Sequence, residues 1–256
     1  MIKAELPQKF KVLNGITLKW IALLSMVIDH FNGVVMKGLI SPYLKDGTLC
    51  FSEDLPKMVF YYPRINEISN ILGRIAFPLF CFLISEGFIH TKNRFKYGLG
   101  IFLFALISEI PFNIAHYSEL FNFSLQNVMF TLCVGVFTLI AFSWTREKFK
   151  DNKLYSTLFP IAVILAGMAI ALVLRSEYVS FGVISIVAFY VLRNSGDFRV
   201  LGILPLAIIL PWTLLAVPLI LLYNGKRGHG NKYFFYIFYP AHFLILSFLR
   251  YLLLRG

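Results

Sequence analysis

The sequence LKWIALLSMVIDHFNGVVM, residues 18–36, places an aspartate and a histidine inside a long apolar run. About 20 such residues allow an α-helix to cross the roughly 30 Å hydrocarbon core of a bilayer. Charge is costly there, and insertion scales make an aspartate at the helix centre about 2.5–3.5 kcal/mol unfavourable. Asp29 and His30 are therefore candidates for a functional site inside a membrane helix.

The composition extends this interpretation to the whole chain. With 58% hydrophobic residues, 14% charged residues and a mean hydropathy of +0.74, the sequence excludes a soluble globular domain. We expect eight apolar segments, at residues 18–36, 70–90, 97–115, 126–143, 156–174, 179–193, 200–222 and 233–253. No hydrophilic stretch between them is long enough for a second domain. The sequence predicts an all-α, polytopic transmembrane helix bundle that forms one domain over residues 1–256.

The number of crossings near the C-terminus is open. The run 179–193 is short for a crossing, and 200–222 is interrupted by Pro205, Pro211 and Pro218. If both runs cross, the connection 224–232 lies outside the cell. If one of them is re-entrant, this connection lies inside.

The distribution of charge predicts the orientation in the cell membrane. Basic residues concentrate in the leader 1–17 and in alternate connections, at Lys92, Arg94 and Lys96 and again at Arg146, Lys148, Lys150 and Lys153. The connection 37–69 mixes basic and acidic residues. By the positive-inside rule, the leader is cytoplasmic and the connection 37–69 is extracytoplasmic. The same distribution explains the net charge of +11 without a nucleic-acid partner.

No metal site is predicted. The three cysteines, Cys50, Cys81 and Cys133, are far apart and fit no metal-ligand spacing. We interpret them as packing residues, with formation of a thioester as the lesser alternative. The sequence contains no Walker, HExxH, CxxC or GxSxG motif.

The spacing within the first run relates its polar residues to one another. Lys19 and His30 are eleven residues apart, close to three helical turns, so both project from nearly the same face. Asp29 points about 100° away from His30 and needs a cation on another helix, for which Arg74 is the first candidate. In the alternative interpretation, Asp29 and His30 only clamp neighbouring helices together.

The second run, GRIAFPLFCFLISEGFIHTKNR (residues 73–94), contributes further polar groups. Glu86 and His90 share a face at the i, i+4 spacing. Pro78 frees a backbone carbonyl and can kink the helix, as in a cavity wall. We expect Arg74, Glu86 and His90 to line a site.

Other polar residues stand at the ends or centres of later runs. Asn127 either lines the site or caps a helix, and Glu109 is expected to be solvated or to act as a cap. Tyr239 and His242 flank Pro240 in the last run and are expected to line the site. Lys226 and Arg227, between glycines, form either a phosphate-binding loop or an ordinary connection.

These segments together resemble the TraX family. The resemblance rests on residues 18–36 and 73–98, on NVMFTL, on LYNGKRG and on KYFFYIFYPAHFLIL, in this order and spacing. It implies a membrane acyltransferase of the kind associated with N-terminal acetylation of pilin. The family is similar to a wider group of polytopic acyltransferases that modify surface sugars from cytoplasmic acyl-CoA. That group has a basic residue, more often Arg, three turns before a histidine, as at Lys19 and His30.

The leading hypothesis is an acyltransferase that uses acetyl-CoA and a peptide or glycan acceptor at the outer face. His30 would be the general base, Asp29 and Arg74 would hold the helices, and His242 would line the site. Lys19, Lys226 and Arg227 would bind the phosphates of CoA. Two alternatives remain: a proton-coupled transporter that relays protons through Asp29, Glu86 and the histidines, and a non-catalytic membrane component of an assembly apparatus.

Overall fold

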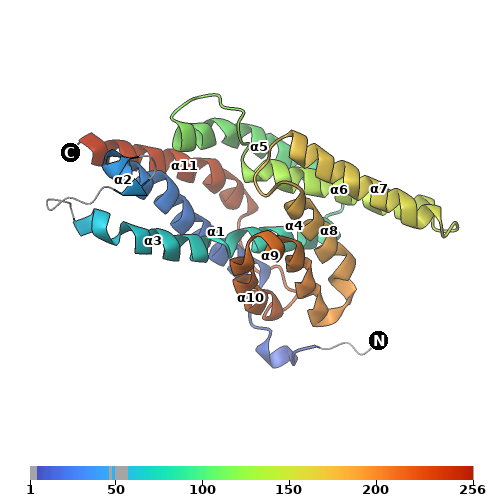
Figure 1. The fold of residues 1–256 in the computed structure, drawn as a ribbon. Coiled ribbons are helices and arrows are strands. Elements are labelled where there is room, and N and C mark those ends of the chain that lie inside the picture. The colour runs from blue at the N-terminus through green and yellow to red at the C-terminus, as the bar shows by residue number, and fades with distance from the viewer. Residues whose placement is uncertain (1–4, 46–47, 50–56, 256) are drawn as a thin grey trace.

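Long apolar helices dominate the computed structural model, which describes residues 5–45, 48–49 and 57–255 (Figure 1). Six stretches are long and apolar enough to cross a membrane: Gly15–Tyr43, Lys57–His90, Arg94–Tyr117, Val128–Lys148, Tyr155–Val173 and Tyr233–Arg255. The prediction of an all-α, multi-pass membrane bundle is confirmed. Within the described residues, the strands β1 (Leu44–Lys45) and β2 (Thr48–Leu49) are two residues long and pair antiparallel.

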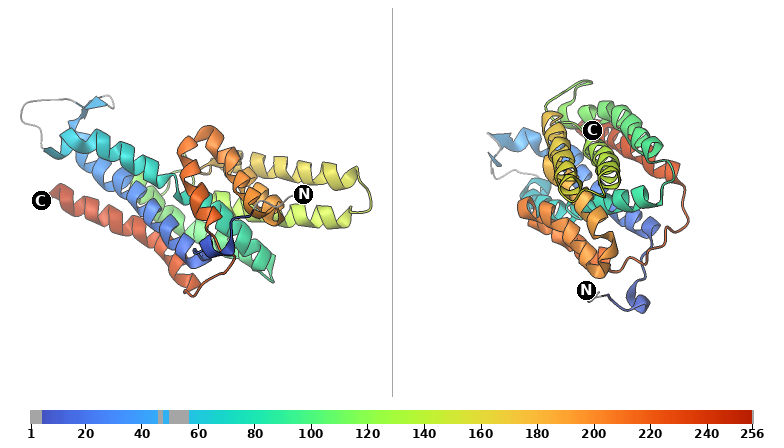
Figure 2. Two further views of the ribbon diagram at one scale, coloured as in Figure 1. Left: turned by 90° about the horizontal axis from the view of Figure 1, so that it is seen from below. Right: turned by 90° about the vertical axis from the view of Figure 1, so that its right-hand side faces the viewer.

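The helical elements follow one another as η1 (Gln8–Phe10), α1 (Gly15–His30), η2 (Phe31–Met36), α2 (Lys37–Ile40), η3 (Ser41–Tyr43), α3 (Lys57–Gly73), α4 (Ala76–His90), α5 (Arg94–Tyr117), α6 (Val128–Lys148), α7 (Tyr155–Val173), α8 (Val179–Val191), η4 (Leu192–Asn194), η5 (Gly196–Ile203), α9 (Leu204–Ile209), η6 (Pro211–Ala216), α10 (Val217–Leu221) and α11 (Lys232–Arg255). The molecule is elongated. The C-terminal end of α11 and the start of α3 lie at one end, and the α6–α7 hairpin reaches toward the other (Figure 2).

The first run is not a uniform α-helix. Asn14 caps α1, since its side chain accepts a hydrogen bond from the backbone N–H of Thr17 at 2.9 Å. Immediately after His30 the helix widens into the π-helix η2 and then returns to α geometry in α2. Short π segments inside α-helices are rare and occur frequently at functional sites.

The connection expected at 37–69 is shorter than predicted. Residues 57–73 form α3, which continues into α4 after a break at Arg74 and Ile75. Polar contacts hold this helix to the first run: the side-chain amide of Asn32 donates to Asn66 at 2.7 Å. Because α3 contains a proline and several polar residues, its sequence does not form a continuous apolar run, and it was predicted as a connection.

The segment 200–222 does not form a membrane-crossing helix, because its prolines divide it into η5, α9, η6 and α10. Both of its ends lie against the N-terminal segment. Lys11 pairs with Asp197 at 3.1 Å, and Leu13 donates its backbone N–H to Leu222 at 2.9 Å and accepts one from Asn224 at 2.8 Å. The segment therefore re-enters, and residues 224–228 lie on the same side as the N-terminal segment.

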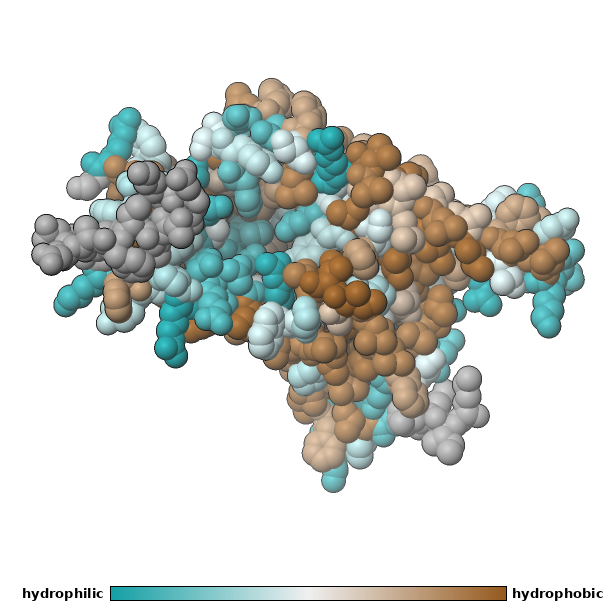
Figure 3. All heavy atoms as spheres, viewed as in Figure 1, coloured by the Kyte–Doolittle hydropathy of each residue, from teal (hydrophilic) through white to brown (hydrophobic). Residues whose placement is uncertain are grey.

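The apolar surface of the bundle is suited to lipid. Hydrophobic residues cover the middle of the molecule, and hydrophilic residues gather toward its ends (Figure 3). Helix α7 exposes a row of large apolar side chains, Leu158, Ile161, Leu165 and Leu172. Such a surface would be costly in water and is expected where a helix faces hydrocarbon.

Candidate functional site

Three histidines from three helices surround the ring of Phe243 in the bundle. Nδ1 of His30 lies 2.7 Å from Nε2 of His242, and the two rings stack with centroids 5.0 Å apart. The ring of His116 lies 6.0 Å from that of His30. We call His30, His116 and His242 the histidine cluster. The sequence singled out His30 and His242 separately, and the structure brings them into direct contact.

The hydrogen bonds assign a tautomer to each member of this pair. Nδ1 of His242 lies 3.2 Å from the backbone carbonyl of Phe238, which can only accept, so this nitrogen carries the proton. Nε2 of His242 is then an acceptor, and Nδ1–H of His30 donates to it. Nε2 of neutral His30 therefore keeps its lone pair, as a general base requires.

His116 is the member of the cluster that sequence analysis did not select. Its Nδ1 lies 3.1 Å from the backbone carbonyl of Phe112, and the residue as a whole is exposed, whereas His242 is buried. His116 is therefore the most exposed of the three histidines. The expected segment 97–115 ended two residues before the end of α5 and so excluded His116, but the spacing of Glu109, Phe112 and His116 would have placed them on one helical face.

The predicted shared face of Lys19 and His30 is confirmed, because both side chains face α11. Nζ of Lys19 lies 5.4 Å from the ring centroid of Phe235, while His30 contacts His242 on the same helix. Lys19 and His30 thus contact α11 at two different positions along the interface between α1 and α11.

The loop that holds Lys226 and Arg227 closes over the start of α1. The backbone carbonyls of these residues accept hydrogen bonds from the N–H groups of Gly15 at 2.8 Å and Ile16 at 3.0 Å. Both side chains are exposed, and the charge of Arg227 is close enough to act on Lys19. The structure thus brings the three cations predicted to bind phosphate to one end of the molecule.

A second polar cluster forms where α3 meets α4. The charges of Asp29 and Arg74 interact, as predicted, and Nη1 of Arg74 donates to the hydroxyl of Tyr178 at 3.4 Å. Gly73 permits this arrangement, since a Cβ atom there would lie 2.6 Å from Cβ of Asp29. Glu177 completes the group, which we call the arginine cluster. Sequence analysis missed Glu177 because it lies in a connection, where carboxylates are usually solvated.

Replacing Glu177 with glutamine is expected to change how stability depends on pH. Burial and, secondarily, the Asp29 carboxylate raise the pKa of Glu177 to about 7, although Arg74 opposes the shift. Between its usual pKa and about 7, the folded chain binds the proton that the unfolded chain releases, so stability falls as pH rises. The Glu177→Gln variant lacks this titrating carboxyl and therefore this loss of stability. Above about pH 7, its thermal midpoint in detergent should exceed that of the wild type.

The matched control for this prediction is Glu119→Gln, which removes an exposed carboxylate. It should keep the pH dependence of the wild type. Identical pH profiles for wild type and Glu177→Gln would contradict the assignment of Glu177 to a buried cluster.

Asn127 has a local structural role. It is fully buried and caps α6 by accepting from the N–H of Met129 at 3.0 Å. Its side-chain amide donates to the carboxylate of Glu109 and, at 2.9 Å, to the carbonyl of Ala105. Of the two interpretations that the sequence left open, the geometry matches the helix cap. Glu109 is the partner of that cap.

The remaining site candidates lie at different places. Tyr239 is buried beside the histidine cluster, with its ring centroid 5.5 Å from that of His242. Glu86 and His90 form a loose i, i+4 pair at 3.9 Å, and the His90 side chain is 69% exposed. The structure therefore groups Tyr239 with His30 and His242, and it leaves His90 at the surface.

Glu86 instead adjoins a cavity on the side of the N-terminal segment. The carboxylate of Glu86 interacts with Tyr223, and burial, together with this charge, raises the pKa of the Tyr223 phenol. Tyr223 lines a cavity of about 270 Å³ with Lys11, Arg193 and Arg199. Nε of Arg199 is buried and has no hydrogen-bond partner among the described residues.

Within the described ranges, no group of three His, Cys, Asp or Glu side chains could hold a metal ion. Cys81 and Cys133 are buried and free, and Cys50 lies outside the described residues. Their surroundings match the packing role expected of them.

Fold and site together define a multi-pass membrane protein with titratable groups gathered inside its helix bundle. Residues 14–250 match the family described as TraX protein, and the chain belongs to this family. It is also similar to a protein of Dichelobacter nodosus named probable fimbrial assembly protein FimC, serogroup H1. The two are 28% identical over 255 residues, which cover 91% of this chain and 94% of that protein. No solved structure matches the chain.

Proposed function

We propose that this chain is a membrane acyltransferase that moves an acetyl group from acetyl-CoA to an amine or hydroxyl on a pilus-related acceptor. The observation that carries the proposal is the 2.7 Å contact between His30 and His242. It orients the imidazole of His30 and leaves Nε2 of the same ring unprotonated. An oriented base in a water-poor interior is the group that acyl transfer to a weak nucleophile requires.

The reaction follows from this arrangement. Nε2 of His30 takes a proton from the acceptor while the acceptor's nitrogen or oxygen attacks the thioester carbonyl. The new C–N or C–O bond forms, the C–S bond breaks, and the leaving thiolate receives the proton from the imidazolium. His242 acts as a positioning residue, because its contact with His30 holds the ring that carries the base.

The cationic side chains at the end of the molecule that holds the N-terminal segment are suited to bind the phosphates of CoA. Lys19, Lys226 and Arg227 lie together there, and the cavity of about 270 Å³ adds Arg193 and Arg199. Neither of these arginines forms an ion pair with a described carboxylate. A guanidinium without a carboxylate partner is a suitable ligand for phosphate oxygens.

The cytoplasm is the proposed location of this end. The connections after α4 and α6, which carry Lys92, Lys150 and Lys153, belong to the same side if successive helices alternate in direction. The positive-inside rule then gives a cytoplasmic N-terminus and access to cytoplasmic acetyl-CoA. The connection between η3 and α3 would face outward.

The similar protein and the TraX family together indicate the class of acceptor. The similar protein is named for fimbrial assembly, and the resemblance to the TraX family implies acetylation of pilin. An acceptor that is consistent with both is a protein of the pilus apparatus that is modified at an amine or hydroxyl.

The test is label transfer from radiolabelled acetyl-CoA, using the purified full-length chain in proteoliposomes with a membrane extract as acceptor. We expect label in an acceptor, and slow thioester hydrolysis when no acceptor is added. Proton flux that depends on a solute, without label transfer, would support the transporter instead. Neither activity would support the assembly component and contradict the proposal.

A further inference from the structure

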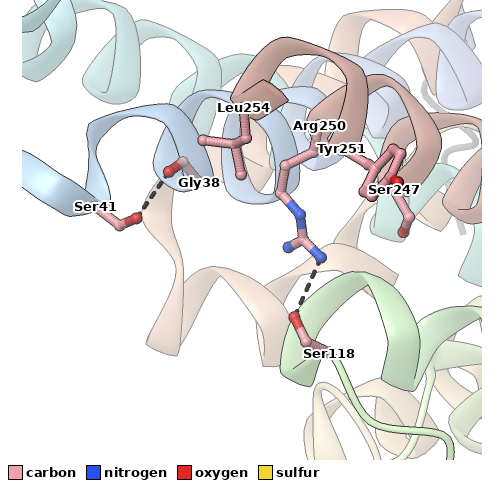
Figure 4. Close-up of a pocket in the computed structure, with 7 residues that line it drawn as sticks. All are labelled: Gly38, Ser41, Ser118, Ser247, Arg250, Tyr251 and Leu254. Carbon is pink, nitrogen blue, oxygen red and sulfur yellow. Dashed lines mark hydrogen bonds between the residues drawn. The ribbon is translucent and has the colours of Figure 1, made fainter. Parts of the chain in front are cut away.

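A pocket of about 340 Å³ lies between α2, α11 and the C-terminal end of α5, at the end of the bundle that holds the C-terminus (Figure 4). Its lining includes Gly38, Ser41, Ser118, Ser247, Arg250 and Tyr251. Ser247 follows Phe243 by one helical turn on α11, and Arg250 lies about 12 Å along the helix from His242. Ser118 comes two residues after His116. The pocket therefore lies beyond the cluster along α11, and none of the three histidines is among its lining residues.

Arg250 provides the charge of this pocket. Figure 4 shows its side chain reaching from α11 toward Ser118. The guanidinium donates to the backbone carbonyls of Ala115 at 3.0 Å and Ile114 at 3.3 Å, and to the hydroxyl of Ser118 at 3.3 Å. These contacts use three of its five N–H groups. No described carboxylate forms an ion pair with it, and no acid lines the pocket.

Two further observations show that the arginine is held in place beside a free polar group. A Cβ atom at Gly38 would lie 2.6 Å from Cδ of Arg250, so the arginine stem packs closely against α2 at this glycine. The hydroxyl of Ser247 is buried and has no hydrogen-bond partner among the described residues. Arg250 and the residue that carries this unused hydroxyl thus line one cavity.

We propose that this pocket binds an oxoanion, a carboxylate or phosphate, carried by the acyl acceptor. Guanidinium N–H groups match the paired oxygens of such anions, and the Ser247 hydroxyl adds one donor. Binding there presents the nucleophile of the acceptor to the histidine cluster from the side opposite to the proposed CoA site. This assignment rests on the proposed function, since it names the acceptor chemistry of the same site.

The experiment measures binding of inorganic phosphate to the purified chain in phosphatidylcholine nanodiscs, without acyl-CoA. The readout is the thermal unfolding midpoint, with chloride at equal ionic strength as reference. We expect a saturable rise for the wild type. Arg250→Gln should weaken phosphate binding at least tenfold, roughly the contribution of one charge-assisted contact.

Two variants control for structural damage. Ser247→Ala removes the free hydroxyl but keeps the contacts of Arg250 to α5, and should weaken binding by a few-fold. Arg255→Gln removes an exposed cation five residues further along α11 and should bind phosphate as the wild type does. Equal affinity in the wild type, Arg250→Gln and Ser247→Ala would overturn the assignment.

A second arm distinguishes the source of the anion. If phosphate binding persists in nanodiscs of phosphatidylglycerol, the pocket is available to an acceptor. If it disappears there, a lipid headgroup occupies the pocket and the acceptor assignment is wrong. A chain that binds phosphate through Arg250 but transfers no acyl group would contradict the proposed function alone. A chain that transfers acyl groups without binding phosphate would contradict this assignment alone.

Discussion

His30→Gln is expected to reduce acyl transfer by at least about 100-fold, because removal of a positioned general base typically costs that much or more. Glutamine retains an N–H donor for Nε2 of His242 but offers no basic nitrogen. The chain should therefore insert and fold as the wild type does. The measurement is the initial rate of label transfer from acetyl-CoA in proteoliposomes, normalised to the amount of folded protein.

The control for this variant is His90→Gln, which makes the same change at an exposed histidine outside the cluster. It should transfer label at the wild-type rate. A companion variant, His242→Phe, keeps an aromatic ring but removes the acceptor for His30, and should lower kcat more than it raises KM. Activity of His30→Gln within a few-fold of the wild type would end the assignment of this residue as base.

Arg74→Gln is expected to destabilise the folded protein by about 2 kcal/mol. The arginine is the cation of the arginine cluster, and its loss leaves Asp29 and Glu177 without a compensating charge. Arg74 acts on both carboxylates through its charge and donates to the hydroxyl of Tyr178 at 3.4 Å, and a hydrogen bond from a charged group contributes about 1.5–3 kcal/mol. The measurement is the free energy of unfolding in mixed detergent micelles.

The informative control restores charge balance. Adding Asp29→Asn and Glu177→Gln to Arg74→Gln should recover most of the lost stability, since no carboxylate then needs a cation. An equally unstable triple variant would show that Arg74 acts through packing. That outcome would contradict the electrostatic account of the cluster.

The fold class follows from the sequence because length and apolarity decide whether a helix can cross a bilayer. The helical period likewise places Lys19 and His30 on the face that meets α11. Predictions of this kind depend on distances within one helix. Such predictions are correct where the helix is regular between the two residues that are compared.

The residues that sequence analysis missed depend on contacts between helices. His116 and Glu177 join their clusters because α5 and the α7–α8 connection pack beside α1 and α4, and no spacing within one helix encodes that. The re-entrant course of 200–222 was one of two alternatives. Pairing of Leu13 with Leu222 and Asn224 decides between them, over a sequence separation that apolar periodicity cannot detect.

The π-helix after His30 affects the angular relation between the base and the oxoanion pocket. In a regular α-helix, eight residues would leave Gly38 rotated about 80° from His30. One additional residue in the wide turn reduces that angle to about 20°, so both positions face α11. The π-helical turn thus places His30 and Gly38 on the same side of this helix. Without it, the His30 imidazole and the glycine that contacts Arg250 would point in different directions.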